Sequence, residues 1–250
     1  MWAKWAFLEE KAHFADMTPK EGFAFKQFTI VHDRCAMKVG TDGVLLGAWA
    51  HGGGRILDVG SGSGLVALMM AQRFPGAWVD GLEIDAAAVE QSRENVAASP
   101  FAGRVAIHAL PFQRFVPRCA YDAIVSNPPY FLNATKNNND SRTLARHSDA
   151  RFFGDLFRFA RRWLVPAGEI SLVVPTESLP DIEAEAYLLG FMLLRRIMVR
   201  STARKPMERC LVSFARRRLA EVEVGEAVLM DGQGRRTAWY AGLTTDFYLH

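Results

Sequence analysis

The chain has 250 residues, half of them hydrophobic, which is enough to bury the core of one large domain and excludes an intrinsically disordered protein. Its formal charge of +3 indicates no particular partner, and three widely separated cysteines (Cys35, Cys119, Cys210) favour neither a disulfide framework nor a zinc site. No apolar run reaches the roughly 18 residues that span a bilayer, so we expect a cytoplasmic protein that does not span a membrane. The cysteine pattern leads us to expect no metal, and we take a monomer as the default.

The N-terminal region lacks a clear period up to a turn at 18–22. We therefore expect an arm or cap over residues 1–24 and a single domain over residues 25–250. Within that domain, residues 25–33 have the composition of a strand. The GTDG turn at 40–43 then precedes a helix of small apolar residues.

From residue 55 onward, short apolar strands alternate with segments of helical period. The expected strands are 55–60, 78–84, 104–110 and 121–127, and the expected helices are 64–74 and 85–99, the second with Asp85 as its N-cap. A polar stretch at 132–148 is too hydrophilic to pack. It is followed by an expected helix at 149–164, a strand at 168–175, a helix at 177–189 and strands at 191–200 and 209–218.

This alternation predicts an α/β fold with helices on both faces of a parallel sheet. The connection between the last two strands is too short for a crossover helix, so these strands should pair antiparallel. We therefore expect a Rossmann-like, doubly wound, mostly parallel seven-stranded sheet with a C-terminal antiparallel hairpin.

A glycine-rich loop, DVGSGSG at 58–64, follows a strand directly and opens a helix. Glycines there let the backbone turn tightly and approach a ligand, so we expect Gly60, Ser61 and Gly62 to bind a cofactor. Glu83 ends the next strand, where a carboxylate can hold the two hydroxyls of an adenosine ribose. A glycine turn beside an edge glutamate, with no ligand, is the plain structural alternative.

The spacing of this loop separates two cofactor classes. Dinucleotide sites carry G-x-G-x-x-G, which cradles a pyrophosphate at a helix N-terminus, and that spacing is absent here. Asp58 would repel a pyrophosphate but attract an ammonium group, which S-adenosylmethionine carries on its methionine end. The sequence therefore favours S-adenosylmethionine as cofactor, with an NAD-dependent oxidoreductase as the alternative from another class.

A second motif, VSNPPYF at 125–131, closes a strand at the edge where doubly wound sheets bind ligands. An amine conjugated to an aromatic ring is a poor nucleophile, because its lone pair is delocalised. The side-chain carbonyl of Asn127 and the backbone carbonyl of Pro128 can accept its two N–H groups and hold it toward a methyl donor. Tyr130 or Phe131 offers a ring on which a flipped base can stack. Asn127, Pro128 and Tyr130 are thus catalytic candidates, Asn127 also a cofactor contact, and an ordinary turn is the alternative.

Basic residues gather between 195 and 218, where nine Lys or Arg accompany one acidic residue. Such a segment could face a polyanion. Within it we select Arg204 and Lys205 as RNA-binding candidates. The polar stretch beside VSNPPYF adds Lys136, Arg142 and Arg146.

The motifs DVGSGSG, GLEID and NPPYF, in this order, resemble those of class I S-adenosylmethionine methyltransferases that modify planar amines. The blocks FKQFTIVHDRCAMKVGTDGVLLGAW and YAGLTTDFYL narrow the resemblance, over about residues 24–250, to bacterial adenine-N6 methyltransferases of tRNA(valine). That resemblance implies a tRNA partner and the adenine 3′-adjacent to the anticodon as target. It also implies that Lys38, Thr41 and Asp42 lie over the methionine end of the cofactor.

One departure from the family pattern concerns the cofactor adenine. Pro111 stands where such enzymes often carry an acidic residue, so adenine recognition would rely on backbone groups and apolar contacts. Two alternatives to tRNA methylation stay open beside the oxidoreductase. One is methylation of another planar amine, such as a protein glutamine or adenine in rRNA or DNA, and the other is a non-catalytic RNA-binding module.

Overall fold

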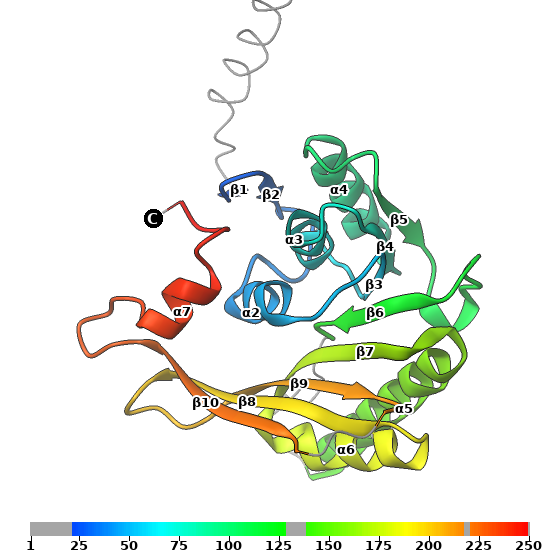
Figure 1. Ribbon diagram of the computed structural model, residues 1–250, viewed down its shortest axis with the longest axis vertical. Helices are drawn as coiled ribbons and strands as arrows, with labels where there is room; N and C mark the ends of the chain where they lie inside the picture. The colour runs from blue at the N-terminus through cyan, green and yellow to red at the C-terminus, as the bar shows by residue number, and fades with distance from the viewer. Residues whose placement is uncertain (1–21, 129–138, 218–220, 250) are drawn as a thin grey trace, which may run out of the picture.

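The computed structural model describes residues 22–128, 139–217 and 221–249, with residues 139–150 described as helical backbone only. Its centre is an eight-stranded sheet with strand order β10-β8-β9-β7-β6-β3-β4-β5 (Figure 1). Neighbouring strands are parallel except around β9, which pairs antiparallel with both β7 and β8. The predicted α/β fold with an antiparallel β8–β9 hairpin is confirmed.

The strands from β3 to β6 are short and mostly apolar, as expected for a sheet that is covered on both faces. The strands of the sheet are β3 (Arg55–Val59), β4 (Trp78–Glu83), β5 (Val105–Ala109), β6 (Tyr121–Ser126), β7 (Leu164–Pro175), β8 (Met192–Thr202), β9 (Arg209–Ala215) and β10 (Glu223–Met230). Successive side chains of a strand point to opposite faces, so Ile56 of β3 joins one core cluster and Leu57 joins the other.

Helices cover the two faces of the sheet in two groups (Figure 1). One group is α2 (Thr41–Trp49), α3 (Leu65–Arg73) and α4 (Ala86–Ala97), and the other is α5 (Asn139–Trp163) and α6 (Leu179–Leu188). Asp85 caps α4 as predicted, because its Oδ2 accepts a hydrogen bond from the Ala88 N–H at 3.3 Å. The remaining described helical elements are two 3₁₀ turns, η1 (Phe112–Arg114) and η3 (Thr176–Ser178), and the short helix α7 (Ala238–Leu243).

Two elements differ from the sequence prediction. β10 adds an eighth strand, parallel to β8, at the edge of the sheet. Only its second half is packed, since Ala227 and Leu229 are buried while Val224 is 62% exposed. The second difference is α5, which begins at Asn139 and so extends into the stretch that we expected to be an unpacked loop.

The N-terminal hairpin of β1 (Gly22–Ala24) and β2 (Thr29–Val31) spans the predicted boundary at residue 24. The chain's C-terminal segment holds this hairpin, because the Lys26 backbone N–H donates to the Phe247 carbonyl at 2.8 Å. The Lys26 ammonium donates to the Thr245 carbonyl at 2.6 Å. Within the described ranges, no helix combines the length and the apolar character needed to cross a membrane.

Candidate active site

The glycine-rich loop forms the floor of the site, between the end of β3 and the start of α3. Gly60 and Gly62 have φ angles of 74° and 52°, in the left-handed region that favours glycine. The Leu82 carbonyl accepts hydrogen bonds from the N–H groups of Gly60 (2.9 Å) and Ser61 (3.0 Å), which ties the loop to β4. A Cβ built on Gly60 or Gly62 would meet no atom within 4 Å. The loop therefore presents bare backbone to open space.

That space consists of two cavities that share one wall. The first, of about 330 Å³, lies between the loop, the end of β4 and the segment after β5. The second, of about 210 Å³, lies between the loop and the N-terminus of α2. Four residues line both cavities, namely Met37, Gly60, Gly62 and Asn127. The structure thus brings Asn127 and the glycine loop together, as the sequence predicted, at the junction of two chambers.

The first cavity is mainly apolar at the end that lies over β5. Leu110, Pro111 and Phe112 line it there, and Pro128 lines it beside Asn127. Glu83 and Asp85 are the two acidic residues in its lining. A flat, mostly apolar ring would fit between these side chains and the loop. Pro111 offers such a ring an apolar surface and no side-chain hydrogen-bonding group.

Glu83 also holds the loop in place. Its Oε2 accepts a hydrogen bond from the Gly62 N–H at 2.8 Å, and its Oε1 accepts from the N–H groups of Ile84 (2.7 Å) and Asp85 (2.9 Å). Each carboxylate oxygen has two lone pairs, so Oε1 is filled by its two N–H donors, whereas Oε2 can still accept from one ligand hydroxyl. Glu83 is therefore both a wall of the cavity and a fixed point for its floor.

The second cavity is more polar than the first, and its lining includes predicted cofactor-binding residues from the GTDG turn region and the glycine-rich loop. Lys38, Thr41, Asp42 and Ser61 all line it. The buried Ser61 hydroxyl has no hydrogen-bond partner among the described residues. Asp42 forms an ion pair with Arg209, whose Nε lies 2.6 Å from Oδ1. Burial raises the pKa of Asp42, and the charge of Arg209 opposes that rise.

Asp58 is placed differently from its neighbours in the motif. Its side chain is buried beneath the loop, with 1% exposed, and it lines neither cavity. Burial raises the pKa of its carboxyl to about 7, a hydrogen bond from the Ala67 backbone lowers it in part, and the charge of Glu83 raises it further. The structure therefore does not bring this carboxylate to the predicted ammonium site.

The Asp58 carboxyl should make the stability of the ligand-free protein depend on pH. Its folded pKa of about 7 lies above the unfolded value near 4, so the folded state binds more protons in this window. The stability it contributes is full below about pH 4 and is lost as pH rises through 7. Urea unfolding should therefore show Asp58→Asn gaining about 2–3 kcal/mol on the wild type between pH 5 and pH 8. An unchanged difference between the two proteins at these pH values would contradict the prediction.

A third cavity, of about 590 Å³, adjoins the second at the ends of β7 and β9. Asp42 and Arg209 line both of them, so their ion pair forms the partition. Sequence reasoning missed Arg209 as a site residue. Its only signal was its position at the start of a strand within the basic segment.

The structure separates the basic segment into two groups. Most of its arginines already form ion pairs within the chain. Arg195 and Arg217 pair with Glu169, and Arg196, Arg200 and Arg209 pair with Glu183, Glu226 and Asp42, respectively. Arg204 and Lys205 are exposed in the β8–β9 connection, and no ion pair to either is found within the described ranges. The next residues, Pro206 to Glu208, line the third cavity.

Five residues predicted to contact the substrate or RNA have side chains outside the described part of the structure. Tyr130, Phe131 and Lys136 lie outside the described residues. Arg142 and Arg146 lie in the first part of α5, of which only the backbone is described.

Comparison with known proteins agrees with this geometry. Residues 37–183 match the family model described as methyltransferase small domain. A "tRNA1(Val) (adenine(37)-N6)-methyltransferase" of Edwardsiella ictaluri is 42% identical over 236 residues, which cover 92% of this chain and 95% of that protein. The protein of the same name from Parabacteroides distasonis is 43% identical, with 91% and 97% of the two chains covered.

A solved structure supports the fold independently. A predicted O-methyltransferase from Agrobacterium tumefaciens superimposes with a TM-score of 0.66 at 20% identity, over 82% of this chain and 96% of that one. The likeness at this identity concerns the fold alone. The family model spans more than half of the sequence, and the two relatives are above 40% identical along nearly all of it. The chain therefore belongs to the methyltransferase small domain family.

Proposed function

We propose that this chain transfers a methyl group from S-adenosylmethionine to the N6 amine of an adenine in tRNA, the reaction in the names of its curated relatives. By those names the target is adenine 37 of a valine tRNA. One observation carries the proposal. Asn127, Gly60 and Gly62 lie in the wall shared by the two cavities, so an amine held by Asn127 would face the middle of a ligand that fills both.

The described residues fit the cofactor. The first cavity offers an apolar slot and the Glu83 carboxylate, which suit an adenine and its ribose. The second offers Lys38 and an unpartnered Ser61 hydroxyl, which suit the charged amino-acid end. Between them, the missing Cβ atoms of Gly60 and Gly62 leave room for a ligand to lie against the backbone. When bound there, the cofactor supplies a methyl group on a positively charged sulfur.

The chain's own contribution to the reaction is to orient the amine. The Asn127 side-chain oxygen and the Pro128 carbonyl would accept its two N–H groups, which aims the nitrogen lone pair at the junction of the cavities. The accepted hydrogen bonds also strengthen as the nitrogen gains positive charge. The methylated amine can lose its proton to water afterwards, so a side-chain base is not required.

The proposed reaction is tested by mapping the product. The purified protein is incubated with labelled S-adenosylmethionine in three separate reactions. These contain total tRNA, an adenine-containing DNA duplex or a glutamine-containing peptide. We expect label in N6-methyladenosine of tRNA after nuclease digestion. Label in the peptide or the DNA, with none in tRNA, would show that the substrate is another planar amine and not an adenine of tRNA.

Binding of tRNA should depend on phosphate contacts made by the β8–β9 connection. One base in a pocket supplies only a few kcal/mol, part of which is spent on unstacking it. Arg204 and Lys205 are exposed beside the third cavity, which adjoins the cofactor chambers. We therefore expect that replacing both with Ala flattens the slope of log affinity against log salt by about one to two units.

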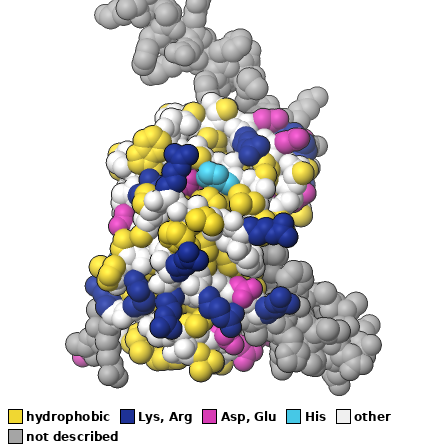
Figure 2. All heavy atoms as spheres, turned by 90° about the vertical axis from the view of Figure 1, so that its right-hand side faces the viewer, with side chains coloured by type: hydrophobic (Ala, Val, Ile, Leu, Met, Phe, Trp, Pro, Cys, Tyr) yellow, Lys and Arg dark blue, Asp and Glu magenta, His cyan; other side chains and the backbone are white. Residues whose placement is uncertain are grey.

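A matched control comes from the opposite edge of the sheet, where the parallel strands begin. Figure 2 shows Lys and Arg side chains in a band across this face too, so a basic surface alone does not locate the RNA. Arg161 and Arg162 are exposed at the end of α5, just before β7. Replacing this pair with Ala removes the same charge and should leave the slope unchanged. If both pairs change the slope equally, the β8–β9 connection has no special role in binding RNA.

A further inference from the structure

Helix α4 buries polar side chains where a helix normally packs apolar ones. Gln91, Ser92 and Asn95 are 0%, 0% and 3% exposed. Gln91 and Asn95 are four residues apart, so they lie on the same face of the helix. A buried carboxamide is retained only where its hydrogen bonds are made. The question is therefore what these two side chains hold.

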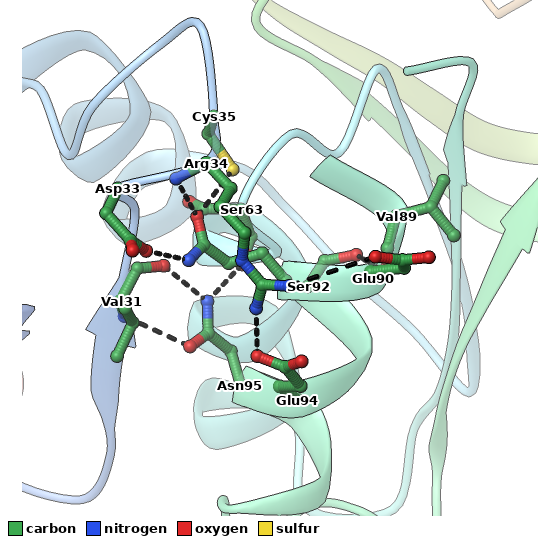
Figure 3. Close-up of polar contacts among 11 residues, drawn as sticks. Val31, Asp33, Arg34, Cys35, Ser63, Val89, Glu90, Ser92, Glu94 and Asn95 are labelled. Carbon is green, nitrogen blue, oxygen red and sulfur yellow. Dashed lines mark hydrogen bonds and ion pairs between the residues drawn. The ribbon is translucent and has the colours of Figure 1, made fainter. Parts of the chain in front are cut away.

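Asn95 joins the N-terminal hairpin to the cofactor loop (Figure 3). Its Oδ1 accepts from the Val31 N–H at 3.0 Å, and its Nδ2 donates to the Val31 carbonyl at 2.8 Å. The same Nδ2 donates to the Ser63 carbonyl at 2.9 Å. One buried amide thus pairs with Val31 as a neighbouring strand would, and fixes Ser63 of the glycine-rich loop at the same time.

Gln91 holds the residues that follow Val31. Its Oε1 accepts from the Arg34 N–H at 3.0 Å and from the Cys35 thiol at 3.2 Å. Its Nε2 donates to the Asp33 carboxylate, and this hydrogen bond is the main cause that lowers the pKa of Asp33. Burial raises the pKa of the Cys35 thiol to about 11, so the thiol keeps the proton that it donates.

The residues held in this way lead directly into the walls of both cavities. We call residues 31–38 the strap. Cys35 and Ala36 line the first cavity, Lys38 lines the second, and Met37 lines both. Ser63 of the glycine-rich loop also lines the second cavity. The two carboxamides therefore provide buried links from α4 to the strap and to the glycine-rich loop.

We propose that Gln91 and Asn95 are positioning residues for the cofactor, which hold the strap against the glycine-rich loop so that both cavities exist before the ligand binds. The inference rests on the proposed use of S-adenosylmethionine. It goes beyond that proposal because neither side chain lines a cavity, so each acts through the backbone that it holds. A preformed strap lowers the ordering cost of binding.

The first test changes Asn95 without changing its shape. Asn95→Asp keeps the acceptor for the Val31 N–H but places an oxygen against the carbonyls of Val31 and Ser63. Losing two donors to buried acceptors should weaken binding of S-adenosylhomocysteine about 10-fold or more. Calorimetry measures both Kd and the number of binding sites per protein molecule. A positioning role raises Kd and leaves one site per molecule. A merely structural role lowers the number of sites, because some molecules are unfolded, and leaves the Kd of the folded molecules unchanged.

The second test is a swap of donor and acceptor. Gln91→Glu sets a carboxylate against Asp33 and should release the strap. Adding Asp33→Asn to that variant restores a donor for the new carboxylate, and Kd should return to within about twofold of wild type. The control is Glu94→Gln, which breaks an exposed ion pair with Arg34 at the rim of the same network and should change Kd by less than about threefold.

Hydrogen exchange of the ligand-free proteins reads the strap directly. We expect faster exchange over residues 31–38 in Asn95→Asp and Gln91→Glu, and wild-type exchange in the swap and the control. Normal Kd and normal exchange in both single variants would overturn the inference, as would failure of the swap to restore both. If wild type itself does not bind S-adenosylhomocysteine, the cofactor proposal falls instead, and exchange alone decides whether the carboxamides hold the strap.

Discussion

Replacing Asn127 with Ala should lower kcat for tRNA methylation by at least about 100-fold, while Kd for S-adenosylmethionine changes little. The side chain lies in the wall common to both cavities, where the methyl group and the amine would meet. Removing it takes away an acceptor that matters most once the nitrogen becomes positively charged. The cofactor keeps its remaining contacts along both cavities, so the loss belongs to the chemical step.

The measurement is single-turnover methylation with enzyme saturated by both substrates. Calorimetry with S-adenosylhomocysteine is run on the same protein. Asn127→Asp is the matched variant, because it keeps an acceptor oxygen in a side chain of the same size. We expect it to retain more activity than Asn127→Ala. If Asn127→Ala reaches the wild-type rate once the cofactor is saturating, and only its Kd for the cofactor is raised, Asn127 is a cofactor contact and does not orient the amine.

The centre of the fold was predictable because its signals are local. β3, the glycine-rich loop and α3 follow one another within 55–73, and the loop's left-handed glycines explain the sequence pattern that marked it. Asp85 was identified as a cap because a cap bonds to its own helix. The location of Asn127 was predictable because it follows a strand, and the carboxyl ends of parallel strands lie together at one end of the sheet.

The elements that sequence reasoning missed depend on distant partners. The first four residues of β10 include two glutamates and a glycine, which give little strand signal, and what makes it a strand is its pairing with β8 at the edge of the sheet. The first turns of α5 carry no apolar stripe before Phe152, so hydrophobic periodicity gives no helical signal there. Asp58 was expected at the cavity surface, but burial at the end of β3 keeps its carboxylate below the loop.

The carboxamides of α4 show the same limit at the site itself. In the sequence, Gln91 and Asn95 belong to the polar run QSREN and look like a solvated helix face. Their partners, Arg34 and Val31, are 57 and 64 residues away in the chain. No local rule distinguishes a buried polar residue from an exposed one until the partner is placed beside it.

Replacing Glu83 with Ala should weaken S-adenosylmethionine binding by roughly 10- to 150-fold, which corresponds to about 1.5–3 kcal/mol for lost charge-assisted hydrogen bonds. Two causes contribute in this structure. The carboxylate lines the first cavity, where it would accept from a ribose hydroxyl of the proposed cofactor, and it also fixes the loop through the Gly62 N–H at 2.8 Å. Kd alone does not separate them, so the test needs a second change, made in the ligand.

A cycle between the protein and the ligand provides that separation. Wild type and Glu83→Ala are each titrated with S-adenosylhomocysteine and with its 2′,3′-dideoxy analogue. If Glu83 binds the ribose, removing both hydroxyls should weaken binding to wild type about 10-fold or more and should have almost no effect on Glu83→Ala, because the acceptor is already gone. If the hydroxyls matter equally in both proteins, Glu83 acts only through Gly62 and the loop. Unchanged Kd for S-adenosylhomocysteine in a folded Glu83→Ala protein would remove the residue from the cofactor site altogether.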